Sequence, residues 1–462
     1  MNINSNEPVS KYVLKNTIPA ILGMIMVLIY NMADLFFVGQ TGDALQVTSV
    51  SLATPVFLVF ISIGTIFGMG GASVISRALG ADNKVYANKV ASFAFGASVI
   101  VGIFVSILLC VFADDIAVKL GATSDTTVQM VSQYISILAI SGPFIILQTC
   151  FSNILRAEGN VQKAMMGMLI GNIVNIVLDP IFILVLGMNV PGAAIATSIG
   201  NVCSGLYYIL FFVKRKSKLS ISLKDFTVKE KVCRNVLAIG IPASLGTIFT
   251  TVSQIVINLL MSDYGELAVA GVGVALKIIL ISWMLCVGLG QGVQPILGFC
   301  VGAKDWDRFL EILKFSLLFG LAIGVVMTVL CYVGLAQIVG GFLADEEAFA
   351  YAYYFSQILL STGCLLGVFN VLTNALGAMG AEKSSLVANA CRQGIIFLPL
   401  ILIMNYTMGI DGLLWAQPIS DVLTLILTII LCVNVYKTLR SKDKVVEKHH
   451  INELGEQNVQ SI

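Results

Sequence analysis

The sequence predicts an all-α integral membrane protein in which twelve transmembrane helices form two pseudo-symmetric bundles of six. The first observation behind this prediction is composition: 57% of the 462 residues are hydrophobic and only 11% are charged, whereas soluble domains carry about 25% charged residues. The second is a series of twelve long apolar stretches, and the third is a set of motifs that occurs once in each half. The net charge of +1 gives no indication of a nucleic-acid partner.

The apolar stretches give the order of the elements. A run of about 20 apolar residues is long enough to cross a bilayer as a helix. Such runs lie at residues 13–38, 48–79, 89–112, 128–156, 162–187, 191–213, 234–262, 267–301, 308–333, 347–377, 386–408 and 412–437. We therefore expect an N-terminal lobe (1–213), a basic linker (214–234), a C-terminal lobe (235–437) and a disordered tail (438–462).

Basic residues predict the orientation of these helices. Lys and Arg are concentrated in the segments that share a side with the two termini, including eight in the linker, whereas the loops on the other side are mostly acidic. Because cytoplasmic loops are enriched in Lys and Arg, we expect a multi-pass protein of the plasma membrane with both termini in the cytoplasm.

The two halves repeat each other. Ile18-Pro19-Ala20 recurs as Ile241-Pro242-Ala243 at a shift of 223 residues. Parallel repeats of this kind are a common plan of secondary transporters, with the substrate between the halves. The repeat is broken at two acids, because Asp34 corresponds to Ile257, and Asp179 in Asp179-Pro180 corresponds to the leucine of Leu398-Pro399.

These two acids are the main candidates for a functional site. On a helix, Asn172, Asn175 and Asp179 fall at i, i+3 and i+7 and therefore share one face. Asp34 is a second lone carboxylate inside an apolar stretch, and an ionisable group at membrane depth indicates function by default. Asn153 and Gln254 either line a cavity or form hydrogen bonds between helices.

Other charged and reactive residues give weaker signals. Asp421 also lies in an apolar stretch, and we expect a structural or cavity role with Arg392 or Lys277 as its partner. Both histidines lie in the tail, and the ten cysteines form no CxxC pair. We therefore expect no metal site, no cofactor and no enzymatic activity.

The sequence resembles the multidrug and toxic compound extrusion (MATE) family over nearly the whole chain to about residue 435. The similarity lies in stretches such as Met32-Ala33-Asp34-Leu35-Phe36-Phe37-Val38-Gly39, Leu155-Arg156-Ala157-Glu158-Gly159-Asn160, Asn175-Ile176-Val177-Leu178-Asp179-Pro180 and Gly292-Val293-Gln294-Pro295. Each motif alone is a modest signal, but their order and spacing over twelve helices make the match strong. Helix seven offers Gln254 and Asn258 in place of acids, which is similar to the DinF-like branch and, within it, the MepA-type efflux proteins.

The resemblance implies a MATE-like fold and an antiporter that exports organic cations or amphiphilic drugs. It implies a coupling site formed by Asp34, Asn175, Asp179 and Thr197. Tyr30 and Asn31 would support the site, and Pro19 would bend the first helix. We expect membrane lipid as the surroundings, no nucleic-acid partner and a monomer.

The coupling ion is H⁺ or Na⁺. Desolvation disfavours the charged form of a carboxylate, and a second carboxylate nearby adds to that effect, so the pair can share one proton. The oxygens of Asn175 and Thr197 also suit Na⁺. The main alternative function is a flippase for a lipid-linked precursor, although that would be expected to have an arginine-rich cavity. An intramembrane enzyme, a channel and a receptor fit the repeat and the lone acids less well.

Overall fold

The computed structural model describes residues 8–40, 44–122, 124–214, 217–229, 231–342 and 345–460, and every regular element in these ranges is helical. The first half contains α1 (Val9–Gly39), α2 (Ala44–Gly80), α3 (Lys84–Val111), α4 (Ala113–Lys119), α5 (Asp125–Ala157), α6 (Val161–Pro180), η1 (Ile181–Val185) and α7 (Asn189–Val213). All but α4 and η1 are long and apolar enough to cross a membrane. The first half therefore contains six spans, as the sequence predicts.

The second half contains η2 (Leu223–Asp225), α8 (Val232–Ser262), α9 (Glu266–Gly302), α10 (Trp306–Val333), α11 (Leu335–Phe342), α12 (Glu346–Leu360), η3 (Gly363–Leu365), α13 (Leu366–Ala378), α14 (Glu382–Ala390), η4 (Cys391–Ile395) and α15 (Phe397–Gln460). Helices α8, α9 and α10 each supply one span. The run Lys383–Asp443 is 61 residues long, about 90 Å of helix, and non-helical dihedral angles at Gly409 divide it. Its two arms supply the last two spans, so the predicted helix pair is confirmed.

The tenth predicted helix, 347–377, is not one straight helix. It is divided into α12 and α13, which are bent by 42° relative to each other. Gly363 lies at this break, where a Cβ would come 2.6 Å from the hydroxyl oxygen of Thr328 on α10. The low helix propensity of glycine and this close approach of α10 account for the bend, which the apolar pattern does not reveal.

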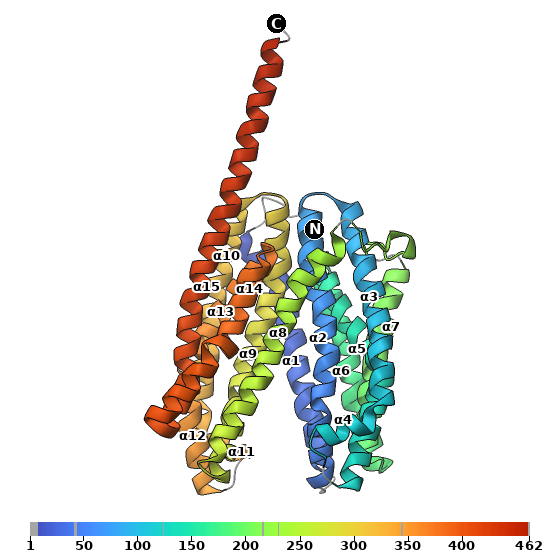
Figure 1. Ribbon diagram of the computed structural model, residues 1–462, viewed down its shortest axis with the longest axis vertical. Coiled ribbons are helices and arrows are strands. Elements are labelled where there is room, and N and C mark those ends of the chain that lie inside the picture. Colours follow the sequence, from blue (N-terminus) through green and yellow to red (C-terminus); the bar gives the residue numbers. More distant parts are fainter. Residues whose placement is uncertain are drawn as a thin grey trace.

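The two halves lie side by side and meet at α1 and α2 of the first half and α8 and α9 of the second (Figure 1). They diverge toward the end opposite the termini. Contact between the halves is concentrated near the termini. A methyl group on Gly240 of α8 would collide with the backbone of Ile66 on α2, so only glycine permits this approach. Ser73 of α2 also donates a hydrogen bond to the carbonyl oxygen of Gly377 on α13. The lobe boundaries at residues 213 and 235 stay a proposal.

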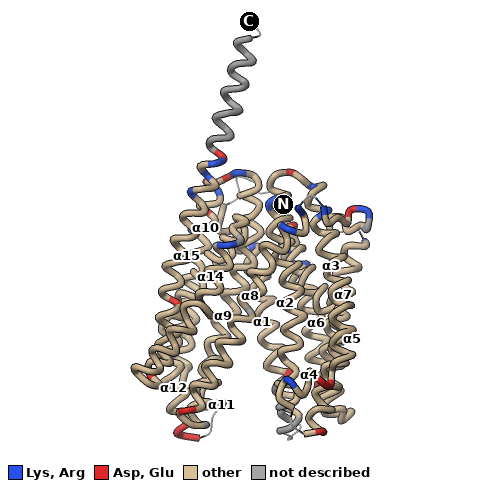
Figure 2. Tube along the Cα trace, viewed as in Figure 1, with Lys and Arg blue, Asp and Glu red and all other residues tan. Residues whose placement is uncertain are grey.

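Basic and acidic residues are distributed unevenly along the membrane axis. Figure 2 shows Lys and Arg gathered mainly at the end where both termini lie, and many of the acids at the opposite end. This arrangement is consistent with the loop pattern that predicted cytoplasmic termini. The orientation itself stays a prediction.

The linker and the tail are more structured than the sequence suggests. In the linker, Ser217 donates a hydrogen bond to Glu158 at the end of α5, while residues 215, 216 and 230 lie outside the described ranges.

The predicted disorder from residue 438 is wrong for the first part of the tail, because α15 continues past that residue. There, Trp306 donates to Asp443 (2.9 Å) and Arg440 pairs with Asp307 (3.0 Å), which holds the helix against α10. The side chains of residues 444–462 lie outside the described set.

Candidate functional site

The first half contains a cavity of about 440 Å³. Residues from α1, α2, α5, α6 and α7 line it, and α9 of the second half closes one side. Of the residues that the sequence singled out, Tyr30, Asn31, Asn153, Asn172, Asn175 and Thr197 line this cavity. Asp34 and Asp179 are not among the lining residues.

Asp179 lies behind the cavity wall and is fully buried. It is in contact with the wall through Asn175, whose Nδ2 atom donates to Asp179 Oδ1 (3.3 Å) and to Thr197 Oγ1 (3.2 Å). Asn175 and Thr197 are themselves 2% and 4% exposed. Three of the four residues proposed for the coupling site are thus connected by hydrogen bonds.

Asp34 is the fourth member of the proposed coupling site. It is half-buried near the end of α1 and lies close enough to Asp179 for the two carboxylates to interact electrostatically. Tyr30, one turn earlier, lies within electrostatic range of both acids and interacts with Thr197. The geometry therefore brings together two acids that are 145 residues apart in the sequence.

Among the described residues, several oxygen atoms of this group have no hydrogen-bond donor. Asp34 Oδ1, Asn175 Oδ1 and Asp179 Oδ2 are buried and accept no hydrogen bond from any described residue. Buried polar atoms are normally paired, and each exception requires an explanation. Orphaned acceptors on residues that interact with one another can be satisfied by a proton on a carboxylate or by a bound cation, which is what a coupling site requires.

A buried arginine beside this cavity was not predicted as a site residue. Arg156 is 3% exposed and donates to Gln291 of α9 across the interface between the halves. It also donates to Asn153 Oδ1 (3.4 Å) and to the sulfur of Met168 (3.3 Å). In the sequence, Arg156 ends an apolar stretch and is typical of a residue at the membrane surface. The one sequence signal that could have marked Arg156 as a site residue is that its counterpart in the second half is the uncharged Gly377.

Pro19 lies within α1, which is continuous from Val9 to Gly39. Because proline has no amide hydrogen, it removes one backbone hydrogen bond from that helix. A bend at this residue during transport stays a prediction.

The second half contains a cavity of about 410 Å³, and Gln254 lines it. Seven amide side chains from several helices line it, among them Gln294, Asn374 and Asn389. The two cavities share lining residues Leu58, Thr65, Met69, Trp283, Val287 and Gln291. Gln254 therefore belongs to the second cavity and not to the neighbourhood of the two acids.

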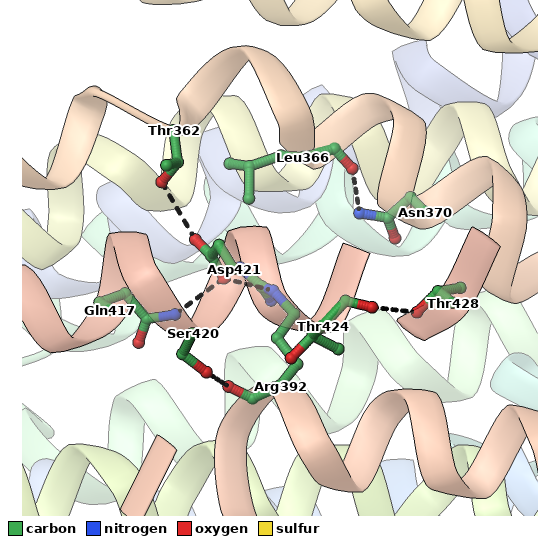
Figure 3. Close-up of polar contacts among 9 residues, drawn as sticks. All are labelled: Thr362, Leu366, Asn370, Arg392, Gln417, Ser420, Asp421, Thr424 and Thr428. Carbon is green, nitrogen blue, oxygen red and sulfur yellow. Dashed lines mark hydrogen bonds and ion pairs between the residues drawn. The ribbon is translucent and has the colours of Figure 1, made fainter. Parts of the chain in front are cut away.

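Asp421 has a partner for each of its oxygens (Figure 3). Arg392 Nε pairs with its Oδ1 at 2.9 Å, and Gln417 donates to the same atom at 3.0 Å. Thr362 donates to Oδ2 at 3.2 Å. The predicted pairing with Arg392 is confirmed, whereas Lys277 lies over the ring of Phe342, with Nζ 5.7 Å from the ring centroid.

Among the described residues, the long apolar helices in two matched halves, with a cavity in each half, define a multi-span membrane transporter. The chain belongs to the MatE family, whose model matches residues 19–181 and 242–403, one segment in each half. The resemblance seen in the sequence is thereby confirmed.

Similar proteins give the same family. The chain is 30% identical over 419 residues to the multidrug export protein MepA of Staphylococcus aureus, covering 90% of this chain and 91% of that protein. It is also 30% identical to MepA of Staphylococcus saprophyticus, covering 89% and 91%. Both names are those of transporters and not of enzymes.

Solved structures share the fold. One is an outward-facing conformation of a multidrug resistance MATE family transporter, with a TM-score of 0.89, 24% identity and coverage of 94% of this chain and 97% of that one. Another is a MATE transporter of Vibrio cholerae, with a TM-score of 0.87, 20% identity and coverage of 93% and 97%. The predicted MATE-like fold is therefore confirmed.

Proposed function

We propose that this chain is a multidrug efflux antiporter of the plasma membrane that exports organic cations or amphiphilic drugs in exchange for H⁺. The observation that supports it most is the group of orphaned acceptors on Asp34, Asn175 and Asp179, which lies directly behind a cavity of about 440 Å³. The names of the two MepA relatives support the same substrate class.

The proposed cycle uses alternating access. With both termini in the cytoplasm, contacts such as Gly240 with Ile66 close the cytoplasmic side, and the halves diverge toward the exterior. From this state, a proton taken up by Asp179 or Asp34 satisfies an orphaned oxygen and changes the hydrogen bonds to Asn175. The change weakens the hold of the cavity on the drug, and the drug leaves before the halves reorient.

The energies are sufficient for this exchange. Exchange of one singly charged cation for one proton moves no net charge, so a difference of one pH unit supplies about 1.4 kcal/mol, which sustains a tenfold drug gradient. For a drug with no net charge, the proton also gains about 2.3 kcal/mol from a potential of 100 mV. Coupling requires that the two conformations differ in proton affinity. Asn175 is the group best placed to make that difference, because it bonds to Asp179 and also forms part of the cavity wall.

Ethidium accumulation in everted vesicles tests the proposal. A pH step with an acidic lumen is expected to drive accumulation, and Asp179→Asn is expected to reduce its initial rate at least tenfold. Asp115→Asn, which changes an exposed acid on the short helix α4, serves as the matched control and should stay within twofold of the wild-type rate.

The same vesicles separate the coupling ions. A Na⁺ step at constant pH is expected to drive little accumulation. Accumulation driven by Na⁺ but not by pH would assign Na⁺ to the same oxygens and overturn H⁺ coupling. Normal pH-driven accumulation by Asp179→Asn would overturn the assignment of this site.

A further inference from the structure

Arg392 occupies a distinctive place in the second cavity. It lies in the π-helical turn η4, a type of distortion that is frequent at functional sites. The residue is 8% exposed and lines the cavity, whereas its partner Asp421 is not among the lining residues. The arginine therefore lies between the carboxylate and the open space.

The guanidinium group is held on one edge and covered by rings. Its Nε atom donates to Asp421 Oδ1 at 2.9 Å, and its backbone oxygen accepts a hydrogen bond from Ser420 at 3.1 Å (Figure 3). The Trp283 and Phe369 ring centroids lie 4.3 Å and 5.2 Å from its Cζ atom. These contacts fix the plane of the group.

The Nη1 and Nη2 atoms at the other edge of the guanidinium group have no such partner among the residues that the structure describes. Within the described ranges of the chain, neither Nη1 nor Nη2 of Arg392 donates a hydrogen bond. Their surroundings hold amides such as Gln254, Asn370 and Asn389, and among the described lining residues there is no carboxylate. A preorganised pair of charged donors thus lies beside a cavity whose described lining does not itself supply the matching anion.

We propose that Arg392 binds the carboxylate of a transported solute, so that the second cavity selects zwitterions over pure cations. Arg donors are arranged in a planar fork that matches the two oxygens of a carboxylate. The cavities share Trp283, Val287 and Gln291, so a solute with its cationic end beside the first half can place a carboxylate beside Arg392. This inference rests on the proposed efflux function.

Two dyes provide a matched test. Rhodamine 123 is the methyl ester of rhodamine 110, so only the second offers a free carboxylate. Binding of each dye to the purified full-length protein in detergent is measured by fluorescence anisotropy. With Arg392→Lys, which keeps the charge but loses the fork, the Kd for rhodamine 110 is expected to rise about tenfold. The Kd for rhodamine 123 should change less than twofold.

A double variant and a surface control distinguish carboxylate binding by Arg392 from a structural role. Arg392→Gln combined with Asp421→Asn removes the ion pair without leaving a charge unpaired, and it should show the same loss for rhodamine 110 alone. Arg440→Lys, at a surface ion pair with Asp307, should change neither Kd. Equal losses for both dyes would mean that Arg392 has a structural role only. An unchanged Kd for rhodamine 110 in both variants would also overturn the proposal.

Failure of the proposed efflux function can be distinguished from failure of the role proposed for Arg392. In that case the wild-type protein in vesicles would accumulate neither dye under a pH step or a Na⁺ step. The selectivity of dye binding in detergent would still support or overturn the role of Arg392.

Discussion

The two lobes share one fold, but they treat a buried carboxylate in opposite ways. In the first lobe, Asp34 and Asp179 each keep a buried oxygen with no donor among the described residues. In the second, both oxygens of Asp421 are bonded, to Arg392, Gln417 and Thr362. A buried charge without a partner is costly. The ion that we propose for the first lobe would reduce that cost, whereas in the second lobe Arg392 already does so.

The internal repeat shows that this contrast is a matter of side chains and not of the backbone. Aligning Pro180 with Pro399, a shift of 219, places Arg392 opposite Ile173. Aligning Gly192 with Gly412, a shift of 220, places Asp421 opposite Asn201. Each lobe therefore has its charges at positions where the other is neutral, and the same helices accommodate both.

The largest expected effect comes from removing the unpartnered acids of the first lobe. Asp34→Asn is expected to reduce pH-driven ethidium accumulation at least tenfold, as is expected for Asp179→Asn, because in the proposed site the two acids share one proton. The double variant should then be no more than twofold slower than the slower single variant. Initial rates in everted vesicles measure all three. If the two losses multiply, the acids act independently and the single coupled site is wrong.

A second prediction compares how a buried carboxylate in each lobe contributes to the stability of the protein. Asp421→Leu leaves Arg392 without its anion, and breaking a buried pair in this way costs about 3–5 kcal/mol. Arg392→Leu combined with Asp421→Leu should recover most of that loss, because an apolar pair of similar volume can replace a buried ion pair. Asp179→Asn should leave the protein at least as stable as the wild type, since it removes a charge that has no cationic partner.

Thermal unfolding of the purified variants in detergent checks this order. The single variant Asp421→Leu should have the lowest Tm, and the double variant should lie close to the wild type. A Tm of Asp179→Asn as low as that of Asp421→Leu would show that Asp179 is a structural acid. The contrast between the lobes would then not hold.

The fold could be predicted almost completely from the sequence, because membrane spans need long apolar runs that composition reveals. The bend at Gly363 could not, since it depends on contact with α10. The acids were found because a charge inside an apolar run is rare. The contact between Arg156 and Gln291 was not found, because a basic residue at the end of a span usually faces the membrane surface, and only packing of the two lobes buries it.

The ion pair of the second lobe could be predicted from the sequence only in part. Both Arg392 and Asp421 stand out in apolar segments, so their pairing could be suggested from sequence. That Arg392 lies between Asp421 and a cavity could not be suggested, because it depends on the π-helical turn and on the rings of Trp283 and Phe369.

The smallest expected effect concerns a third charge that only the first lobe has. Glu158, at the end of α5, corresponds to the buried Met379 in the second lobe. Burial raises the pKa of the Glu158 carboxyl, and hydrogen bonds from Ser217 and Asn160 offset part of that shift. Because its folded-state pKa lies above the unfolded value, its contribution to stability is present at low pH and is lost as pH rises through the folded pKa.

Glu158→Gln should therefore remove a small pH dependence. The Tm of the variant relative to the wild type is expected to rise as pH increases from about 4 to 8, while Glu311→Gln, which changes an exposed acid on α10, should show no such trend. A difference that stays constant with pH would mean that the donors from Ser217 and Asn160 fully offset burial. The charge on Glu158 would then serve to anchor the linker at no expense of stability, unlike the charges on Asp34 and Asp179, each of which keeps one buried oxygen without a donor among the described residues.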